Sequence, residues 1–302
     1  MIFLCGIASE PSLGLVIERL QEIGAPHVVF HQRHFADAQL QMEVRKGGVE
    51  GEFRLNGDRH RLEDFTAIYT RLMEWQVLPE IEHEPMNSPL RVHCQNLHAA
   101  LLQWYELAPG RVLGRSADIA VTYSKPWQLQ LIRQHGFAVP ETLVTNDPAE
   151  VRRFRKRHGR VVFKSASYVR SVVDLLKGDD LDAVRFCPVL FQQFIEGKNL
   201  RVHTVGNRVF ATSIDASAVD YRYAQDETLQ ATTVDEEFAK RCLALATAFG
   251  VEFAGIDFRV TDDGEVYCLE LNPSPAFSYY ELQTGQPIAR AVAEYLVSGV
   301  VS

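Results

Sequence analysis

An Asp-Gly pair near the C-terminus joins two segments of alternating polarity, and this feature constrains the fold more than any other in the sequence. The segments lie within residues 254–273, and Asp263-Gly264 between them is typical of a two-residue hairpin turn. Such a turn predicts that Asp257 lies directly opposite Glu270. Because successive strand residues point to opposite faces, Arg259 and Asn272 are expected to share their face. The other face is then formed by Ile256, Phe258, Leu269 and Leu271.

Two carboxylates directly opposite each other repel, so the predicted pair needs compensation. The compensation is a proton, a basic side chain or a divalent cation. Asp257 and Glu270 with the amide oxygen of Asn272 form an all-oxygen donor set, which suits Mg²⁺ better than zinc. The alternative is an exposed hairpin face on which Arg259 neutralises the pair. The spacing leaves both interpretations open.

Two lysines upstream of the hairpin interrupt segments that otherwise have regular patterns. Lys125 opens a helix beside Pro126, and Lys164 follows the apolar run 161–163. A lysine at a helix N-terminus opposes the helix dipole, so an anionic ligand would explain Lys125. Solvated surface lysines are the alternative. Between Lys164 and the hairpin, residues 191–197 predict a buried strand that leaves through a polar hinge, where backbone groups can face a purine edge.

Composition and absent motifs exclude several function classes. The 302 residues are 46% hydrophobic with a net charge of −8, which disfavours a nucleic-acid partner. No apolar run reaches the roughly 18 to 20 residues that span a bilayer, so no membrane association is expected. The sequence contains no P-loop, GxGxxG, HExxH or GxSxG pattern. Five cysteines without CxxC spacing indicate reduced thiols in a cytoplasmic protein.

The chain divides into two parts. Strand patterns at 2–7, 27–30 and 65–70, with helices at 12–23 and 89–107, predict a small α/β unit over residues 1–110. The second part alternates helices at 125–135, 148–158 and 235–249 with strands at 140–145, 161–163, 189–195, 200–205 and 208–214.

The order of these features resembles the ATP-grasp ligases. The stretches that carry the likeness are "GFAVPETLVTND", "VVFK", "VLFQQFIEGKNLRVHTVG" and "GIDFRVTDDGEVYCLELNPSPAFSYYE". They run from about Arg111 to the C-terminus. Within the superfamily, "PETLVTNDPAEVRRF", "VFATSIDASAVDYRY" and "NPSPAFSYYELQTGQPIA" are most similar to ribosomal-protein glutamate ligases and graspetide (microviridin-type) macrocyclases.

The resemblance implies an α/β (α+β) ATP-grasp fold. Residues 1–110 would be the N-terminal pre-ATP-grasp α/β domain that commonly precedes such modules. Residues 111–302 would be the ATP-grasp domain, with a central lobe at 111–188 and a C-terminal lobe at 189–302. A homodimer is expected by the same analogy.

The resemblance also implies a nucleotide site. Lys125 and Lys164 would contact the phosphates of ATP, with Lys164 also near the adenine. Gln192, Gln193 and Ile195 would line the adenine pocket, the last two through backbone groups.

Two positions depart from the family pattern. Asn199 stands where the family often has an acidic ribose ligand, and this departure puts the ribose contact in doubt. The segment 165–171 after the second lysine lacks the glycine that the phosphate-covering flap often contains. Its serines and backbone N–H groups would have to cradle the phosphates.

At the reacting centre, the resemblance assigns Asp257, Glu270 and Asn272 to two Mg²⁺ ions, with Mn²⁺ as an alternative. Arg201 and Arg222 would steady the transferred phosphoryl group or a substrate carboxylate, a task suited to guanidinium groups.

The implied reaction is the activation of a carboxylate by ATP. The carboxylate takes the γ-phosphoryl group to give an acyl phosphate, and an amine or hydroxyl then displaces phosphate to form an amide or ester. A peptide or protein is the expected substrate. Small metabolites such as amino acids are an alternative, and a nucleotide-binding protein without ligase activity is another.

Overall fold

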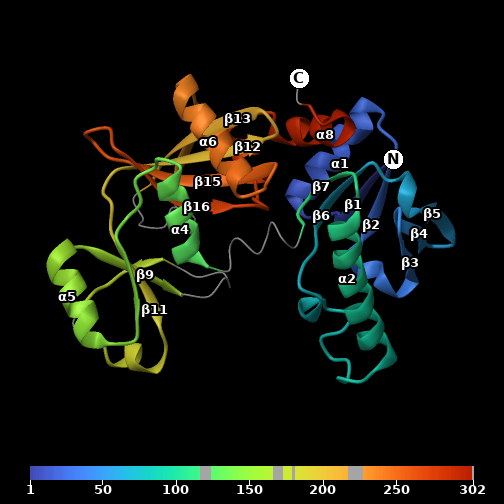
Figure 1. Ribbon diagram of the computed structural model, residues 1–302, viewed down its shortest axis with the longest axis horizontal. Helices are drawn as coiled ribbons and strands as arrows, with labels where there is room; N and C mark the ends of the chain where they lie inside the picture. The colour runs from blue at the N-terminus through green and yellow to red at the C-terminus, as the bar shows by residue number, and fades with distance from the viewer. Residues whose placement is uncertain (116–123, 166–172, 179–180, 217–226, 301–302) are drawn as a thin grey trace.

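The structure is a computed structural model that describes residues 1–115, 124–165, 173–178, 181–216 and 227–300. Its described residues form four β-sheets with helices packed around them (Figure 1). The N-terminal region, drawn in blue and cyan, lies at one end, and two further sheets with their helices lie at the other (Figure 1).

The first sheet is parallel, with strand order β2-β1-β6-β7. Its carboxyl ends therefore lie on one edge, where ligands bind in open α/β sheets. An antiparallel meander, β3-β4-β5, accompanies it. The bounds of this region are β1 Ile2–Gly6, α1 Pro11–Ile23, β2 His27–His31, η1 Gln32–Asp37, β3 Ala38–Arg45, β4 Gly48–Leu55, β5 Asp58–Arg61, η2 Leu62–Asp64, β6 Ala67–Arg71, η3 Trp75–Val77, α2 Pro89–Leu107 and β7 Arg111–Leu113.

The second sheet is small and antiparallel, in the order β10-β9-β11-β8, and helix α5 packs against it. Asp147 caps α5, and Pro148 occupies its first turn, as the sequence predicts. One face of the sheet packs Phe163 and Phe191 against Val151 and Phe154 of the helix. The bounds are β8 Thr142–Thr145, α5 Pro148–His158, β9 Val161–Ser165, β10 Asp174–Leu175, η4 Asp182–Phe186 and β11 Val189–Gln193.

The third sheet has five antiparallel strands in the order β14-β13-β12-β15-β16. Helices α4 and α6 pack on one face through a core that includes Ile132, Leu245, Ile256 and Leu271. The bounds are α4 Lys125–Gln134, β12 Lys198–Val205, β13 Arg208–Asp215, β14 Thr228–Thr232, α6 Glu236–Ala248, β15 Phe253–Val260, β16 Val266–Asn272, α7 Ser278–Thr284 and α8 Ile288–Ser298.

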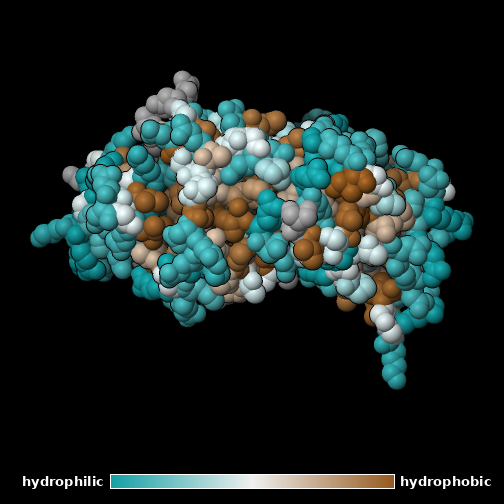
Figure 2. All heavy atoms as spheres, turned by 90° about the horizontal axis from the view of Figure 1, so that it is seen from above, coloured by the Kyte–Doolittle hydropathy of each residue, from teal (hydrophilic) through white to brown (hydrophobic). Residues whose placement is uncertain are grey.

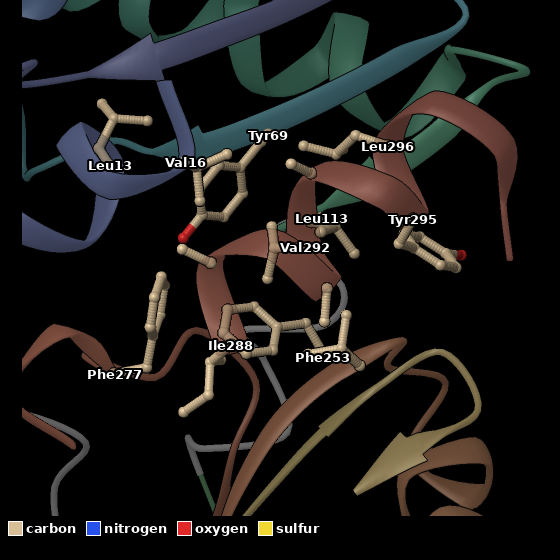
Figure 3. Packing of buried hydrophobic residues seen from close by; sticks show 14 of the residues in the cluster. Leu13, Val16, Tyr69, Leu113, Phe253, Phe277, Ile288, Val292, Tyr295 and Leu296 are labelled. Carbon is tan, nitrogen blue, oxygen red and sulfur yellow. The ribbon is translucent and has the colours of Figure 1, made fainter. Parts of the chain in front are cut away.

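Helix α8 joins the third sheet to the N-terminal region. Its side chains Ile288, Val292 and Leu296 are fully buried in one cluster with Leu13 of α1 and Phe253 of β15 (Figure 3). The cluster also holds residues of β1, β6 and β7, so the last helix of the chain completes the core of the first sheet. Burial on this scale favours a fixed relation between the two regions.

At each expected domain boundary, 110/111 and 188/189, the strand that follows the boundary pairs with a strand that precedes it. Strand β7, which follows the first boundary, pairs with β6 of the first sheet. Strand β11, which follows the second, pairs with β9 and β8 of the second sheet.

The surface seen from above carries hydrophilic residues at both ends, whereas apolar residues gather between them (Figure 2). Within the described part of the chain, no helix has both the length and the apolar character that crossing a membrane requires.

Candidate functional site

A cleft between the second and third sheets gathers most of the predicted site residues. It is open to solvent on one side, its empty volume with the open solvent included is about 720 Å³, and β9, β11, β12, β15 and β16 supply its walls. The predicted residues that line it are Lys164, Gln192, Gln193, Ile195, Asn199, Asp257 and Glu270. These residues come from two sheets that form no ladder with each other, so only the tertiary fold brings them together.

Asp257 lies directly opposite Glu270, which confirms the predicted pair. The predicted two-residue turn is wrong. Thr261 N–H donates to the Glu265 carbonyl (3.0 Å), so residues 262–264 form the turn, with Gly264 at φ +87°. A three-residue turn with glycine in the left-handed region is a common hairpin form. It shifts the register by one residue, and Phe258 consequently pairs with Cys268.

A β-bulge restores the carboxylate pair. The register changes between Asp257 and Phe258, so Leu269 is the extra residue on β16. The bulge also corrects the predicted faces of β16. Leu269 lines the cleft, and Cys268 instead is fully buried in the core of the third sheet.

A buried cation, Arg201, lies beside Asp257. It sits on β12 directly across from Asp257, and its Nη1 donates to Asp257 Oδ2 at 2.7 Å. The two side chains are only 6% and 14% exposed. The hairpin face is not exposed as the alternative supposed, since Arg259 is buried and its Nη1 donates to the Gly197 carbonyl (2.6 Å). Arg259 also lies over the ring of Phe194.

Asn272 completes the donor set. Its Nδ2 lies 3.4 Å from Asp257 Oδ2 and 3.3 Å from Glu270 Oε1, so the amide bridges both carboxylates. Turning the amide by 180° would bring Oδ1 to this position, which is the orientation that a cation requires. Two carboxylates on either side of one amide, whose oxygen can turn toward them, fit a hard divalent cation such as Mg²⁺.

Lys164 projects from the opposite wall. On β9 it shares its face with Val162, which also lines the cleft, whereas Phe163 packs against α5. The lysine is 7% exposed, and the ion pairs formed by the described residues leave it without a carboxylate. A buried ammonium group needs an anionic partner, and a phosphate entering the cleft would supply one.

The residues predicted to line the adenine pocket lie at the end of β11. Gln192 Nε2 donates to Thr142 Oγ1 (3.1 Å), which fixes its side chain against β8. Gln193 N–H donates to the Glu141 carbonyl (2.9 Å), so a backbone contact from Gln193 to a ligand would have to use its carbonyl. Ile195 and Asn199 are buried.

Lys125 does not line this cleft. It begins α4, as predicted, and Gln128 one turn later makes two hydrogen bonds to the backbone of Leu271 (2.8 and 3.1 Å). This clamp fixes the start of α4 beside the strand that carries Glu270. Arg222 and residues 166–171 of the expected flap lie outside the described residues.

Sequence reasoning missed two residues that shape the site. Gly255 makes room for Arg201, because a Cβ at this position would overlap the guanidinium and lie 2.9 Å from Pro275 Cβ. His203 accepts a hydrogen bond from Arg201 Nε at 3.3 Å. The signal for His203 was its spacing: two residues after Arg201 on a strand, it had to share the same face.

The N-terminal region holds the segment that follows Asn272. Arg71, at the carboxyl end of β6, pairs with Glu10 (2.9 Å) and donates to the Pro275 carbonyl (3.0 Å). Ser12 Oγ accepts from the N–H groups of Phe277 and Ser278 (3.3 and 3.4 Å). The carboxyl edge of the first sheet is therefore directly connected to the site.

Comparison with known proteins agrees with this geometry. Residues 122–296 match the RimK-like ATP-grasp domain, which is more than half of the chain. The chain belongs to the RimK-like ATP-grasp family. This finding confirms both the resemblance and the expected ATP-grasp fold. The family match includes Lys164, Arg201 and the whole carboxylate hairpin.

Relatives of this RimK-like chain include human N-acetylaspartylglutamate synthase A, 23% identical over 213 residues, which are 62% of this chain and 52% of that protein. The chain thus spans about half the length of the curated relatives that it matches first. A solved neighbour is macrocyclase MdnC of Microcystis aeruginosa bound to its precursor peptide MdnA. It is 24% identical with a TM-score of 0.83, over 99% of this chain and all of that one. The ATP-grasp ligase PsnB in complex with minimal precursor, Mg and ADP is 25% identical with a TM-score of 0.80, over 98% and 96% of the chains.

Proposed function

We propose that this chain is an ATP-dependent ligase that joins a carboxylate to an amine or a hydroxyl, with a peptide or protein as its substrate. The observation that carries the proposal is the cleft in which Lys164 and the Asp257–Glu270 pair line walls from two different sheets. A cationic group and a pair of carboxylates in one cleft suit a magnesium-bound polyphosphate, in which both charges find partners.

The residues present fit Mg·ATP. Asp257, Glu270 and Asn272 would hold the metal, as one or two ions, with Mn²⁺ as the other candidate. Bound there, the metal would neutralise charge on the phosphates. Lys164 would contact a phosphate, and the apolar end of the cleft near Ile195 would accept the base, with the carbonyl of Gln193 as a hydrogen-bond acceptor.

The remaining site residues would position the reacting groups. Arg201 lies beside Asp257, so its guanidinium would orient the transferred phosphoryl group or the substrate carboxylate as an acyl phosphate forms. Arg222 is proposed for the same task. The buried surroundings of Arg201 would keep water from the activated carboxylate. An amine or hydroxyl of the second substrate would then displace phosphate.

A peptide substrate is supported by MdnC and PsnB, which match nearly the whole chain and were solved with precursor peptides. Small metabolites are the second candidate, because relatives such as N-acetylaspartylglutamate synthase A are named for a small product. That relative matches only 62% of this chain, whereas both peptide-bound neighbours match 98% or more, including the N-terminal region.

The test is ADP release from Mg·ATP in the presence of pooled acidic peptides or pooled amino acids, with the Glu270→Gln protein as a blank. Stimulation by peptides, with loss of water from the peptide mass, supports the proposal. Stimulation by amino acids alone favours the metabolite ligase. If neither pool stimulates and calorimetry detects no binding of Mg·ATP, the proposed function is wrong.

Three further expectations stay proposals. One is the division into a pre-ATP-grasp domain at residues 1–110 and an ATP-grasp domain with lobes at 111–188 and 189–302, although β7 and β11 each pair with a strand that precedes the boundary. A cytoplasmic location is supported by five unpaired cysteines, four of them buried. A homodimer remains to be tested by light scattering.

A further inference from the structure

Three side chains contact the guanidinium of Arg201, which extends from β12 of the third sheet. Asp257 Oδ2 accepts from its Nη1 at 2.7 Å, and His203 Nε2 accepts from its Nε at 3.3 Å. The ring of Tyr280, from α7, lies 5.5 Å from the guanidinium carbon. Each contact comes from a different element or a different position on the sheet, so together they restrict both the place and the plane of the group.

His203 sits where the charged part of this face meets the apolar core. Along β12 the face carries Asn199 in the cleft, then Arg201, then His203, then Val205 in the cluster shared with α8. His203 is completely buried, and its ring packs edge-to-face on Tyr280 at 4.8 Å.

The surroundings of the imidazole favour its neutral form. Burial, and then the charge of Arg201, hold the pKa of His203 well below its usual value. A neutral imidazole has one donor and one acceptor nitrogen, and which is which depends on its partners. Because Nε2 faces the Nε–H donor of Arg201, the geometry favours Nε2 as the acceptor and Nδ1 as the protonated nitrogen, although Nδ1 has no acceptor among the described residues.

Gly255 leaves the space that the guanidinium of Arg201 occupies when it donates to His203. Gly255 pairs with His203 across the ladder between β12 and β15, and a Cβ there would overlap the guanidinium. The arginine therefore crosses its neighbouring strand at the one residue that has no side chain, and Asn272 lies opposite that glycine on β16.

We propose that His203 is a positioning residue for the ligase reaction, which as the neutral Nδ1–H tautomer fixes the Arg201 guanidinium over Gly255 and against Asp257. Its kinetic consequence rests on the proposed function. Arginine has many rotamers, and ordering one during the reaction costs free energy. An arginine that is already ordered by His203 avoids this cost when the transition state forms.

Two amide variants test the role of Nε2. The Oε1 atom of His203→Gln can reach the position of Nε2, whereas the shorter side chain of His203→Asn places its oxygen near that of Nδ1. Thr204→Val is the matched control. Thr204 is the next residue of β12 and is buried, and its hydroxyl makes no hydrogen bond to the described residues.

We expect His203→Asn to lower kcat for substrate-dependent ADP formation about 10- to 100-fold, with the KM for ATP changed less than about twofold. His203→Gln should stay within about threefold of the wild type, and Thr204→Val should match it. The proposal is overturned if His203→Asn has wild-type kcat, or if His203→Gln is as impaired as His203→Asn while both unfold at the same urea concentration.

A second readout does not depend on ligase activity. Long-range ¹H–¹⁵N correlation spectra of the free protein, with His203 assigned through the His203→Gln variant, should show Nδ1 protonated and Nε2 unprotonated between about pH 6 and 8. A proton on Nε2 would overturn the proposal, because that nitrogen cannot then accept from Arg201. If no substrate stimulates ADP release, the proposed function fails while this measurement still decides the tautomer.

Discussion

Asp257 and Glu270 are cross-strand neighbours because Leu269 bulges out of β16 between Glu270 and Cys268. The bulge brings Glu270 opposite Asp257 and at the same time turns Leu269 into the cleft. One irregularity thus sets both the carboxylate pair and part of the apolar wall, in keeping with the frequency of bulges beside active sites.

Both carboxylates should be needed for activity, and Asp257 should contribute to stability as well. Glu270→Gln and Asp257→Asn are both expected to abolish Mg²⁺-dependent ADP release. Asp257→Asn should also lower the free energy of unfolding by about 3 kcal/mol, because it breaks the buried ion pair with Arg201. Urea unfolding followed by circular dichroism gives the second quantity. Unchanged activity in either variant would refute the metal assignment.

Lys164→Ala should weaken the binding of Mg·ATP about 10- to 100-fold, because it removes a charged hydrogen-bond donor from the cleft wall. Lys177→Ala is the control, since Lys177 is exposed and does not line the cleft. Titration calorimetry measures both dissociation constants. A value for Lys164→Ala equal to that of the control would place the phosphates elsewhere.

Leu269 and Leu271 should respond in opposite ways to truncation. Leu271 is fully buried, so Leu271→Ala should cost about 3 kcal/mol of unfolding free energy. Leu269→Ala should cost less than about 1 kcal/mol yet weaken nucleotide binding several-fold, because its side chain lines the cleft. Urea titration and calorimetry on both variants check this. Equal stability losses with unchanged nucleotide affinity would contradict the bulge.

Gly255→Ala should disable the site although it adds only one methyl group. The new Cβ would overlap the Arg201 guanidinium, so the arginine must leave Asp257 or the strands must shift. We expect loss of ADP release and a stability cost of about 1 to 3 kcal/mol. Gly47→Ala, at a turn where a Cβ meets nothing, is the control. Wild-type turnover by Gly255→Ala would show that the position of Arg201 does not matter.

The hairpin shows which features a local sequence pattern predicts and which it does not. Asp257 opposite Glu270 was predicted correctly, but from a turn that is one residue too short and without the bulge that compensates for it. Turn chemistry and strand periodicity are local, and they found both strands. A bulge depends on how each side chain packs against other elements, here Cys268 in the core and Leu269 in the cleft, and no local pattern contains that.

The chain's own sequence indicated many of the strands and helices, the family, and which residues carry charge in apolar runs. Those properties follow from periodicity, capping and motif order, which act over a few residues. Tertiary structure alone decided that Arg201 pairs with Asp257 and that Gly255 leaves room for its guanidinium. Those contacts join strands distant in the chain, and sheet order and the space left by a missing side chain exist only once the sheet has formed.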